Sequence, residues 1–81
     1  MRLHIIYTEG GVLLSKRDYA SWREIQDAHE DFKTSLGPWE QEVVVGYLDD
    51  EYPDLDPPAR EQVGALVAGE GHTRALAFRA T

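Results

Sequence analysis

The hydrophobic and polar positions near the start of the chain predict a β-hairpin. Residues 3–8 place apolar or β-branched side chains on both faces of an extended segment, which is typical of a strand in the centre of a sheet. Glu9-Gly10-Gly11 is a turn signal, because two glycines tolerate a positive φ. Residues 12–14 are apolar again and predict the returning strand.

A helix is predicted over residues 21–36. Ser21 and Glu24 fit a capping box, in which each side chain satisfies the other residue's backbone amide. Apolar side chains then recur at intervals of three and four, as on one helix face: Trp22, Ile25, Ala28 or His29, Phe32 and Leu36. Gly37-Pro38 would end this helix, since Gly suits the left-handed position after a helix and Pro cannot continue it. An alternative start lies at Ser15.

The second half of the chain predicts a strand, a helix and a last strand. Residues 42–48 are apolar on both faces, which favours a strand. Asp56 and the two prolines after it open a second helix, with Asp as its N-cap and Pro at its first position. Gly64 either weakens this helix or marks close packing, and a glycine-rich turn ends it at residues 69–71. Residues 73–80 alternate, which predicts a half-buried edge strand.

The predicted elements define the fold class. Their order is ββαβαβ, and 81 residues make one domain, residues 1–81. We therefore expect a single small α+β domain, in which a four-stranded antiparallel or mixed sheet carries two helices on one face.

Composition and charge exclude several classes of protein. The chain has no cysteine, which excludes disulfides and thiolate metal sites and fits a cytoplasmic location. Its apolar runs are too short for a signal peptide or a membrane span. A net charge of -7 argues against direct binding to nucleic acid or to anionic membranes, because both recruit Lys and Arg. The charge favours a basic partner, or solubility alone.

The whole net charge comes from one stretch. Residues 40–56 hold seven acids and no base, whereas the other positions hold eight acids and eight bases. Like charges packed together reduce stability, so this segregation favours a partner-binding surface over a loop that only keeps the chain soluble. Tyr47 and Tyr52 lie among the acids, and an aromatic beside carboxylates suits an Arg-rich partner.

The predicted partner-binding residues form two groups. The first is an extended acidic loop, in which side chains two residues apart lie roughly 6.6–6.8 Å apart, an interval comparable to backbone phosphates. Such a row could occupy and block a groove built for nucleic acid. The second is the acidic side of the first helix. The residues are Asp49, Asp50, Glu51, Tyr52 and Asp54 on the loop, and Glu24, Asp27 and Asp31 on the helix.

No catalytic site, metal site or cofactor is predicted. The three histidines, His4, His29 and His72, stand on separate elements without metal-ligand spacing. The glycines at 69–71 precede a strand rather than a helix, so they indicate a helix end and not a phosphate loop. The acids do not match a calcium loop, and a small domain offers little room for a cleft that desolvates paired carboxylates. We therefore expect no enzyme.

A resemblance to a known class of proteins rests on two acidic runs in a small α+β domain without cysteine. The runs are Asp49-Asp50-Glu51 and Asp54-Leu55-Asp56. The chain resembles, by type rather than by motif, the small acidic phage-encoded inhibitor proteins of the anti-CRISPR class. The resemblance implies a non-enzymatic inhibitor that mimics nucleic acid and blocks a basic nucleic-acid-binding complex, such as a CRISPR effector. The alternative is a homodimeric or other homo-oligomeric interaction module joined through the last strand, where Ala75 and Ala77 share the outer face.

Overall fold

A β-hairpin forms the centre of the fold. In the computed structural model, which describes residues 1–79, strand β1 (Arg2–Thr8) pairs antiparallel with β2 (Gly11–Ser15). Leu3 and Ile5 are fully buried on one face of β1, and Ile6 is fully buried on the other. The predicted hairpin and the central position of its first strand are confirmed.

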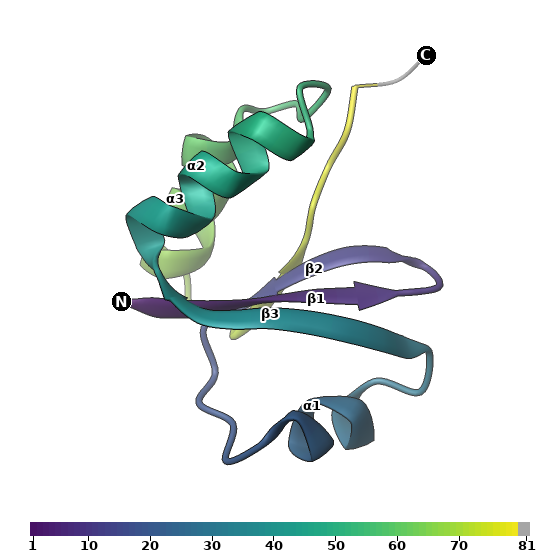
Figure 1. Ribbon diagram of the computed structural model, residues 1–81. Helices are drawn as coiled ribbons and strands as arrows, with labels where there is room; N and C mark the ends of the chain where they lie inside the picture. The colour runs from purple at the N-terminus through teal and green to yellow at the C-terminus, as the bar shows by residue number, and fades with distance from the viewer. Residues whose placement is uncertain (80–81) are drawn as a thin grey trace.

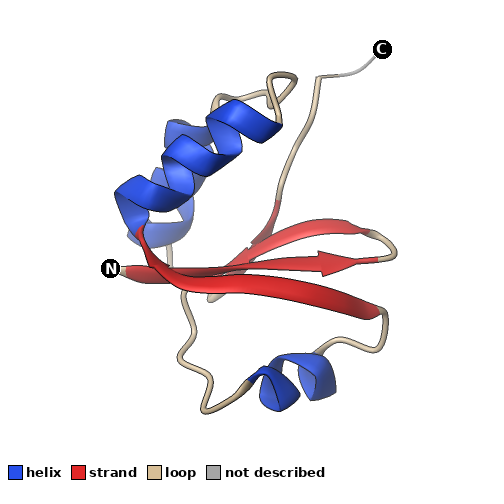
Figure 2. Cartoon of the chain, in the orientation of Figure 1, coloured by secondary structure: helices blue, strands red, loops and turns tan. Residues whose placement is uncertain are grey.

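Two further strands complete an antiparallel sheet. Strand β3 (Phe32–Glu40) pairs with β1 and strand β4 (Thr73–Ala75) pairs with β2, giving the order β3-β1-β2-β4 (Figure 2). The predicted α+β class and the four-stranded sheet are confirmed. The last strand lies at a sheet edge as predicted, but it is shorter than predicted. Beyond it, Phe78 forms an isolated antiparallel bridge with Leu55, which belongs to a different segment. The predicted end of this strand, Ala80, lies outside the described residues.

The described helices cover both faces of the sheet rather than one. Helix α1 (Trp22–Ala28) lies on one face, and helices α2 (Gln41–Glu51) and α3 (Ala59–Ala68) lie side by side on the other (Figure 1). The element order is therefore ββαβααβ. The predicted order ββαβαβ lacks helix α2, and the two predicted helices, which correspond to α1 and α3, lie on opposite faces of the sheet (Figure 1).

The predicted helix over residues 21–36 was wrong beyond Ala28, because the chain then turns into β3. Strand β1 is buried, and its backbone N–H and C=O groups need partners along both edges. Residues 33–35 are Lys-Thr-Ser, a weak helix-forming run, so pairing with β1 outweighs the helical period. The apolar positions 32 and 36 fell on that period by chance.

Gly37-Pro38 lies within β3 and does not end a helix. Gly37 has a φ of +108°, and a Cβ at this position would lie 2.6 Å from the carbonyl oxygen of Leu3. Only glycine allows β3 to approach β1 this closely. The peptide bonds that precede Pro38 and Pro57 are both cis.

Ser21 is the N-cap residue of α1, so the predicted start of this helix is confirmed. The predicted capping box was wrong, because the Ser21 side chain makes no capping hydrogen bond and the Glu24 carboxylate accepts from the backbone N–H of Ala20 at 3.0 Å. The alternative start, Ser15, is buried in β2. Helix α3 exists as predicted, but Pro58 occupies its N-cap position and the predicted cap, Asp56, lies outside it.

Residues 42–48 belong to helix α2, so the predicted strand was wrong. The buried residues of α2 are Val44, Val45 and Leu48, which share one face of a helix, whereas Val43 is 54% exposed. A strand would instead have alternated its buried positions. The run of valines fits either element, because an apolar run has no clear period.

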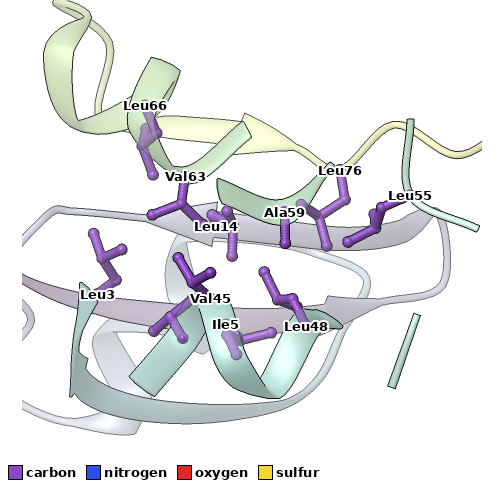
Figure 3. Packing of buried hydrophobic residues seen from close by; sticks show 11 residues of the cluster. Leu3, Ile5, Leu14, Val45, Leu48, Leu55, Ala59, Val63, Leu66 and Leu76 are labelled. Atoms are coloured by element: carbon purple, nitrogen blue, oxygen red, sulfur yellow. The ribbon is translucent and has the colours of Figure 1, made fainter. Parts of the chain in front are cut away.

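The main core lies between the sheet and helices α2 and α3 (Figure 3). The opposite face is smaller and packs Ile25 of α1 beneath the sheet, where Ile6 is also buried. A Cβ placed at Gly64 meets no neighbouring atom within 4 Å, so close packing does not explain this glycine. The main core consists of Leu3, Ile5, Leu14, Val44, Val45, Leu48, Leu55, Ala59, Val63, Leu66 and Leu76.

A buried glutamine joins α3 to the segment after β4. The Gln62 side chain is fully buried and donates to the carbonyl oxygens of Pro57 at 2.6 Å and Ala77 at 2.9 Å. Its Oε1 accepts from the backbone N–H of Ala77 at 2.8 Å. The Gln62 side chain thus satisfies both the N–H and the C=O of Ala77, as the backbone of a neighbouring strand would. These hydrogen bonds hold the segment around Ala77 against α3.

Candidate functional site

The predicted acidic loop is largely a helix end. Asp49, Asp50 and Glu51 form the last turn of α2, Tyr52 is its C-cap residue, and Asp54 lies in the connection to α3. The four carboxylates are exposed. Successive residues of an α-helix point about 100° apart, so Asp49, Asp50 and Glu51 do not form a row at phosphate spacing. The prediction of an extended acidic row was wrong for residues 49–51.

The charge of this turn opposes the helix dipole. The C-terminal end of a helix carries a partial negative charge, which favours cations and disfavours anions, typically by about 0.3–1 kcal/mol for each exposed charge. The last turn of α2 contains no basic residue. Asp49, Asp50 and Glu51 are therefore placed where they reduce the stability of the helix, so folding does not explain their position.

Arg60 of α3 offsets part of the negative charge. Its guanidinium donates two hydrogen bonds of 3.1 Å to the Glu42 carboxylate, which lower the pKa of Glu42 and raise the pKa of Arg60. The charge of Asp49 also raises the pKa of Arg60. Within residues 1–79 the only other ion pair joins the Met1 amino group to Glu40. Among the described residues, the acids of this region without an ion pair are Asp49, Asp50, Glu51, Asp54 and Asp56.

Five aromatic side chains form a continuous row, which we call the aromatic row. The Trp39 and Tyr47 rings meet edge-to-face with centroids 5.4 Å apart, and the Tyr47 hydroxyl lies 3.1 Å from the Tyr7 hydroxyl. The Tyr52 hydroxyl donates to Tyr7 at 3.4 Å, and the Tyr52 ring meets the Phe78 ring edge-to-face at 5.7 Å. The row therefore begins in β3 and ends beside the acids at the end of α2.

Tyr7 at the centre of the aromatic row is a structural phenol. Burial raises its pKa well above the ordinary range, and the hydrogen bonds with Tyr47 and Tyr52 raise it further. A phenol with a raised pKa is a poor nucleophile, because less of it is ionised. The three hydroxyls thus hold the rings in place and do not form a reactive centre.

A short strand pairing brings Phe78 to the acids. Leu55 and Phe78 form an antiparallel bridge, flanked by hydrogen bonds from the Arg79 N–H to the Asp54 carbonyl at 2.7 Å and from the Asp56 N–H to the Ala77 carbonyl at 3.2 Å. Phe78 is 39% exposed. The predicted strand over residues 73–80 includes Phe78, but nothing in the local sequence indicates that this residue pairs with the acidic segment.

The second predicted group lies on a different layer. Helix α1 and helix α2 are on opposite faces of the sheet, so their acids do not form one surface (Figure 1). Glu24 accepts from Ala20, and the Asp31 carboxylate accepts from the Gly10 N–H at 3.1 Å, so both have local structural roles. Asp27 is exposed beside a hollow of about 370 Å³, which Arg17 also lines.

The three histidines have different surroundings. His4 is buried against the edge of the Tyr19 ring, and burial lowers its pKa. His29 is the C-cap residue of α1, and His72 is exposed before β4. In the part of the chain that the structure describes, no group of three or more His, Asp or Glu side chains is placed to hold a metal ion. The helices described there are also too short or too polar to cross a bilayer.

Comparisons of the chain with protein-family models, with curated proteins and with solved structures give no match. The strongest candidate for a functional site is the surface at the end of α2, where unpaired carboxylates and partly exposed aromatic rings meet.

Proposed function

We propose that this domain is a non-enzymatic binding protein that engages a basic surface of a partner protein. The binding residues are Asp50, Glu51 and Asp54, with Tyr52 among them. The observation that carries the proposal is the last turn of α2, where exposed carboxylates stand at the negative end of a helix without a base in that turn. Residues that reduce stability are typical of functional sites.

The charge of the whole chain supports the same partner. A net charge of -7 attracts basic surfaces over a distance, and all the acids of residues 40–56 except Glu40 and Glu42 follow the middle of α2. Association with a basic protein is then fast at low salt and weakens as the salt concentration rises.

In its specific form, the proposal is an inhibitor of the anti-CRISPR kind that covers a nucleic-acid-binding surface of its partner. The helical arrangement of Asp49, Asp50 and Glu51 suits a compact basic patch better than a groove that follows a phosphate backbone. The alternative, a homodimer joined through the last strand, has weaker support, since β4 has three residues and offers few backbone hydrogen bonds.

Paired charge reversals test the proposal. Asp50→Lys with Asp54→Lys changes the acidic end of α2, and Asp27→Lys with Glu30→Lys changes the net charge equally on the other layer of the fold. The probe is a fluorescein-labelled deca-arginine peptide, and its affinity is measured by fluorescence anisotropy at about 50 mM and about 300 mM NaCl. Circular dichroism checks that both variants stay folded.

We expect the α2 variant to bind about tenfold more weakly than the α1 variant at low salt, with a smaller difference at high salt. Equal losses in the two variants would mean that only the net charge matters, and the proposal would be wrong. Capture from a lysate of the source cell, with both variants as baits, then identifies a partner by its absence from the α2 variant alone.

A further inference from the structure

The exposed end of the aromatic row is a fixed platform. Phe78 is 39% exposed, and its ring meets the Tyr52 ring edge-to-face, with centroids 5.7 Å apart and planes 75° apart. The backbone on both sides of Phe78 is held by hydrogen bonds, from Ala77 to Gln62 and from Arg79 to Asp54. A half-exposed ring held in this way presents apolar surface without needing to be ordered when a partner binds.

Acidic residues lie on the segment that pairs with this platform. Glu51 precedes Tyr52 in the chain, and Asp54 and Asp56 flank Leu55, the bridge partner of Phe78. These three carboxylates and Arg79 are exposed. Residues 50–56 contribute four acids here, against the single base Arg79 of residues 77–79. A ligand that docks at Phe78 therefore lies next to a segment with an excess of negative charge.

An arginine side chain can interact with both an aromatic ring and a carboxylate. The face of an aromatic ring attracts cations, and a planar guanidinium can stack on the ring while it donates two parallel hydrogen bonds to a carboxylate. A lysine ammonium is a strongly hydrated point charge that lacks the flat face and the forked donors. Arginine thus fits this place better than lysine of equal charge.

We propose that Phe78, which packs against Tyr52, is the docking position for an arginine side chain of the basic partner, with Glu51 and Asp54 on the neighbouring segment. The proposal rests on the proposed function and deepens it, because it names the residue type that the surface selects. The remaining aromatic row, from Tyr7 to Trp39, supports the platform from within the fold.

Peptides of equal charge test the proposal on the unaltered protein. The probes are acetyl-Gly-Arg-Gly-Arg-Gly-amide and its lysine counterpart, and NMR titration of the isotope-labelled domain measures both affinities and maps the contact. We expect the arginine peptide to bind about two- to fivefold more tightly, because only the guanidinium can stack flat on the ring and donate two parallel hydrogen bonds to a carboxylate. The shifts should be largest at Tyr52, Asp54 and Phe78. Equal affinities, or shifts centred elsewhere, would overturn the proposal.

A substitution then tests the ring itself. Phe78→Leu keeps an apolar side chain but removes the aromatic face, and Trp22→Leu is the control, because Trp22 is also exposed and lies on α1. The preference for arginine should vanish with Phe78→Leu and persist with Trp22→Leu. If Phe78→Leu keeps the preference, the ring does not select arginine. In that case weaker binding of Asp50→Lys with Asp54→Lys would still support the proposed function, so the two ideas fail separately.

Discussion

Helices α2 and α3 lie side by side on the same face of the sheet, but their C-terminal ends are built in opposite ways (Figure 1). The last turn of α2 carries three carboxylates. At the end of α3, the Lys16 ammonium reaches over from the sheet and donates to the carbonyl oxygens of Leu66 at 2.8 Å and Gly69 at 2.5 Å, with a longer contact to Val67. One helix end is neutralised, and the other is made more negative.

This contrast shows that the fold can place a cation at the negative C-terminal end of a helix. A cation from a distant part of the chain serves α3, and Glu61 in the first turn of α3 also suits the dipole. The acids at the end of α2 therefore do not reflect a lack of suitable positions for bases. Their position fits our proposal of a binding surface, and the experiments below test this comparison.

Removing the cation from α3 should have the largest effect. Lys16→Met keeps the length and apolar stem of the side chain but loses the hydrogen bonds to the last carbonyls of α3. We expect a loss of about 1.5–3 kcal/mol in the free energy of unfolding, the usual value for hydrogen bonds to a charged group. Urea denaturation measures it, with the exposed Lys33→Met as the control. Similar losses in both variants would contradict the capping role.

Neutralising the end of α2 should do the reverse. Asp50→Asn with Glu51→Gln removes two negative charges from the last turn, and we expect a gain of about 0.6–2 kcal/mol at low salt. Glu61→Gln, at the start of α3, should instead lose about 0.3–1 kcal/mol. Thermal unfolding at low and high salt gives both values. A loss of stability in the α2 variant would show that its acids serve the fold.

The middles of the two helices should respond alike. Gly46 of α2 and Gly64 of α3 have open space where the methyl group of an alanine would lie, so Gly→Ala meets no clash at either position. We expect each substitution to raise the free energy of unfolding by about 0.5–1 kcal/mol, which urea denaturation measures. Equal gains in the free energy of unfolding would show that the two helices differ only at their ends. A gain in only one of them would show that the contrast extends along the helix.

A pH titration should show an effect that depends on neither helix end. Burial lowers the pKa of His4 below its ordinary value of 6.5, while Asp18 raises it and Arg2 lowers it further. The unfolded chain therefore takes up this proton first, and stability falls as the pH drops from 6.5 towards the folded-state pKa. Thermal unfolding between about pH 5 and about pH 8 should show this slope in Lys16→Met, but not in His4→Phe. A slope that survives His4→Phe has another source.

The sequence pattern predicted the fold class because the hairpin and α3 carry local signals. Turn glycines mark the hairpin, and α3 lies between a pair of prolines and Gly69. The pattern failed where tertiary pairing decides the structure. Residues 32–40 become a strand because β1 needs a second neighbour, and the valines of α2 gave no period of their own.

The candidate site was predicted in composition but not in shape. Charge segregation marked Asp50, Glu51, Tyr52 and Asp54 without any structure. Their helical arrangement depends on the packing of α2, and the contact with Phe78 depends on a bridge between residues 55 and 78. Neither feature is encoded locally, because each is fixed by contacts between segments that are far apart in the chain.

The hydrogen bonds between Gln62 and Ala77 have a consequence for the order of events during protein synthesis. The central strand β1 is synthesised first. The buried side-chain amide of Gln62 can form its hydrogen bonds with Ala77 only after Ala77 has left the ribosome. Leu76 and Phe78 arrive with it, so the core and the aromatic row are completed together. A nascent chain that lacks this segment would have neither a finished core nor the proposed docking position for arginine, so under our proposal binding begins only after the segment has been translated.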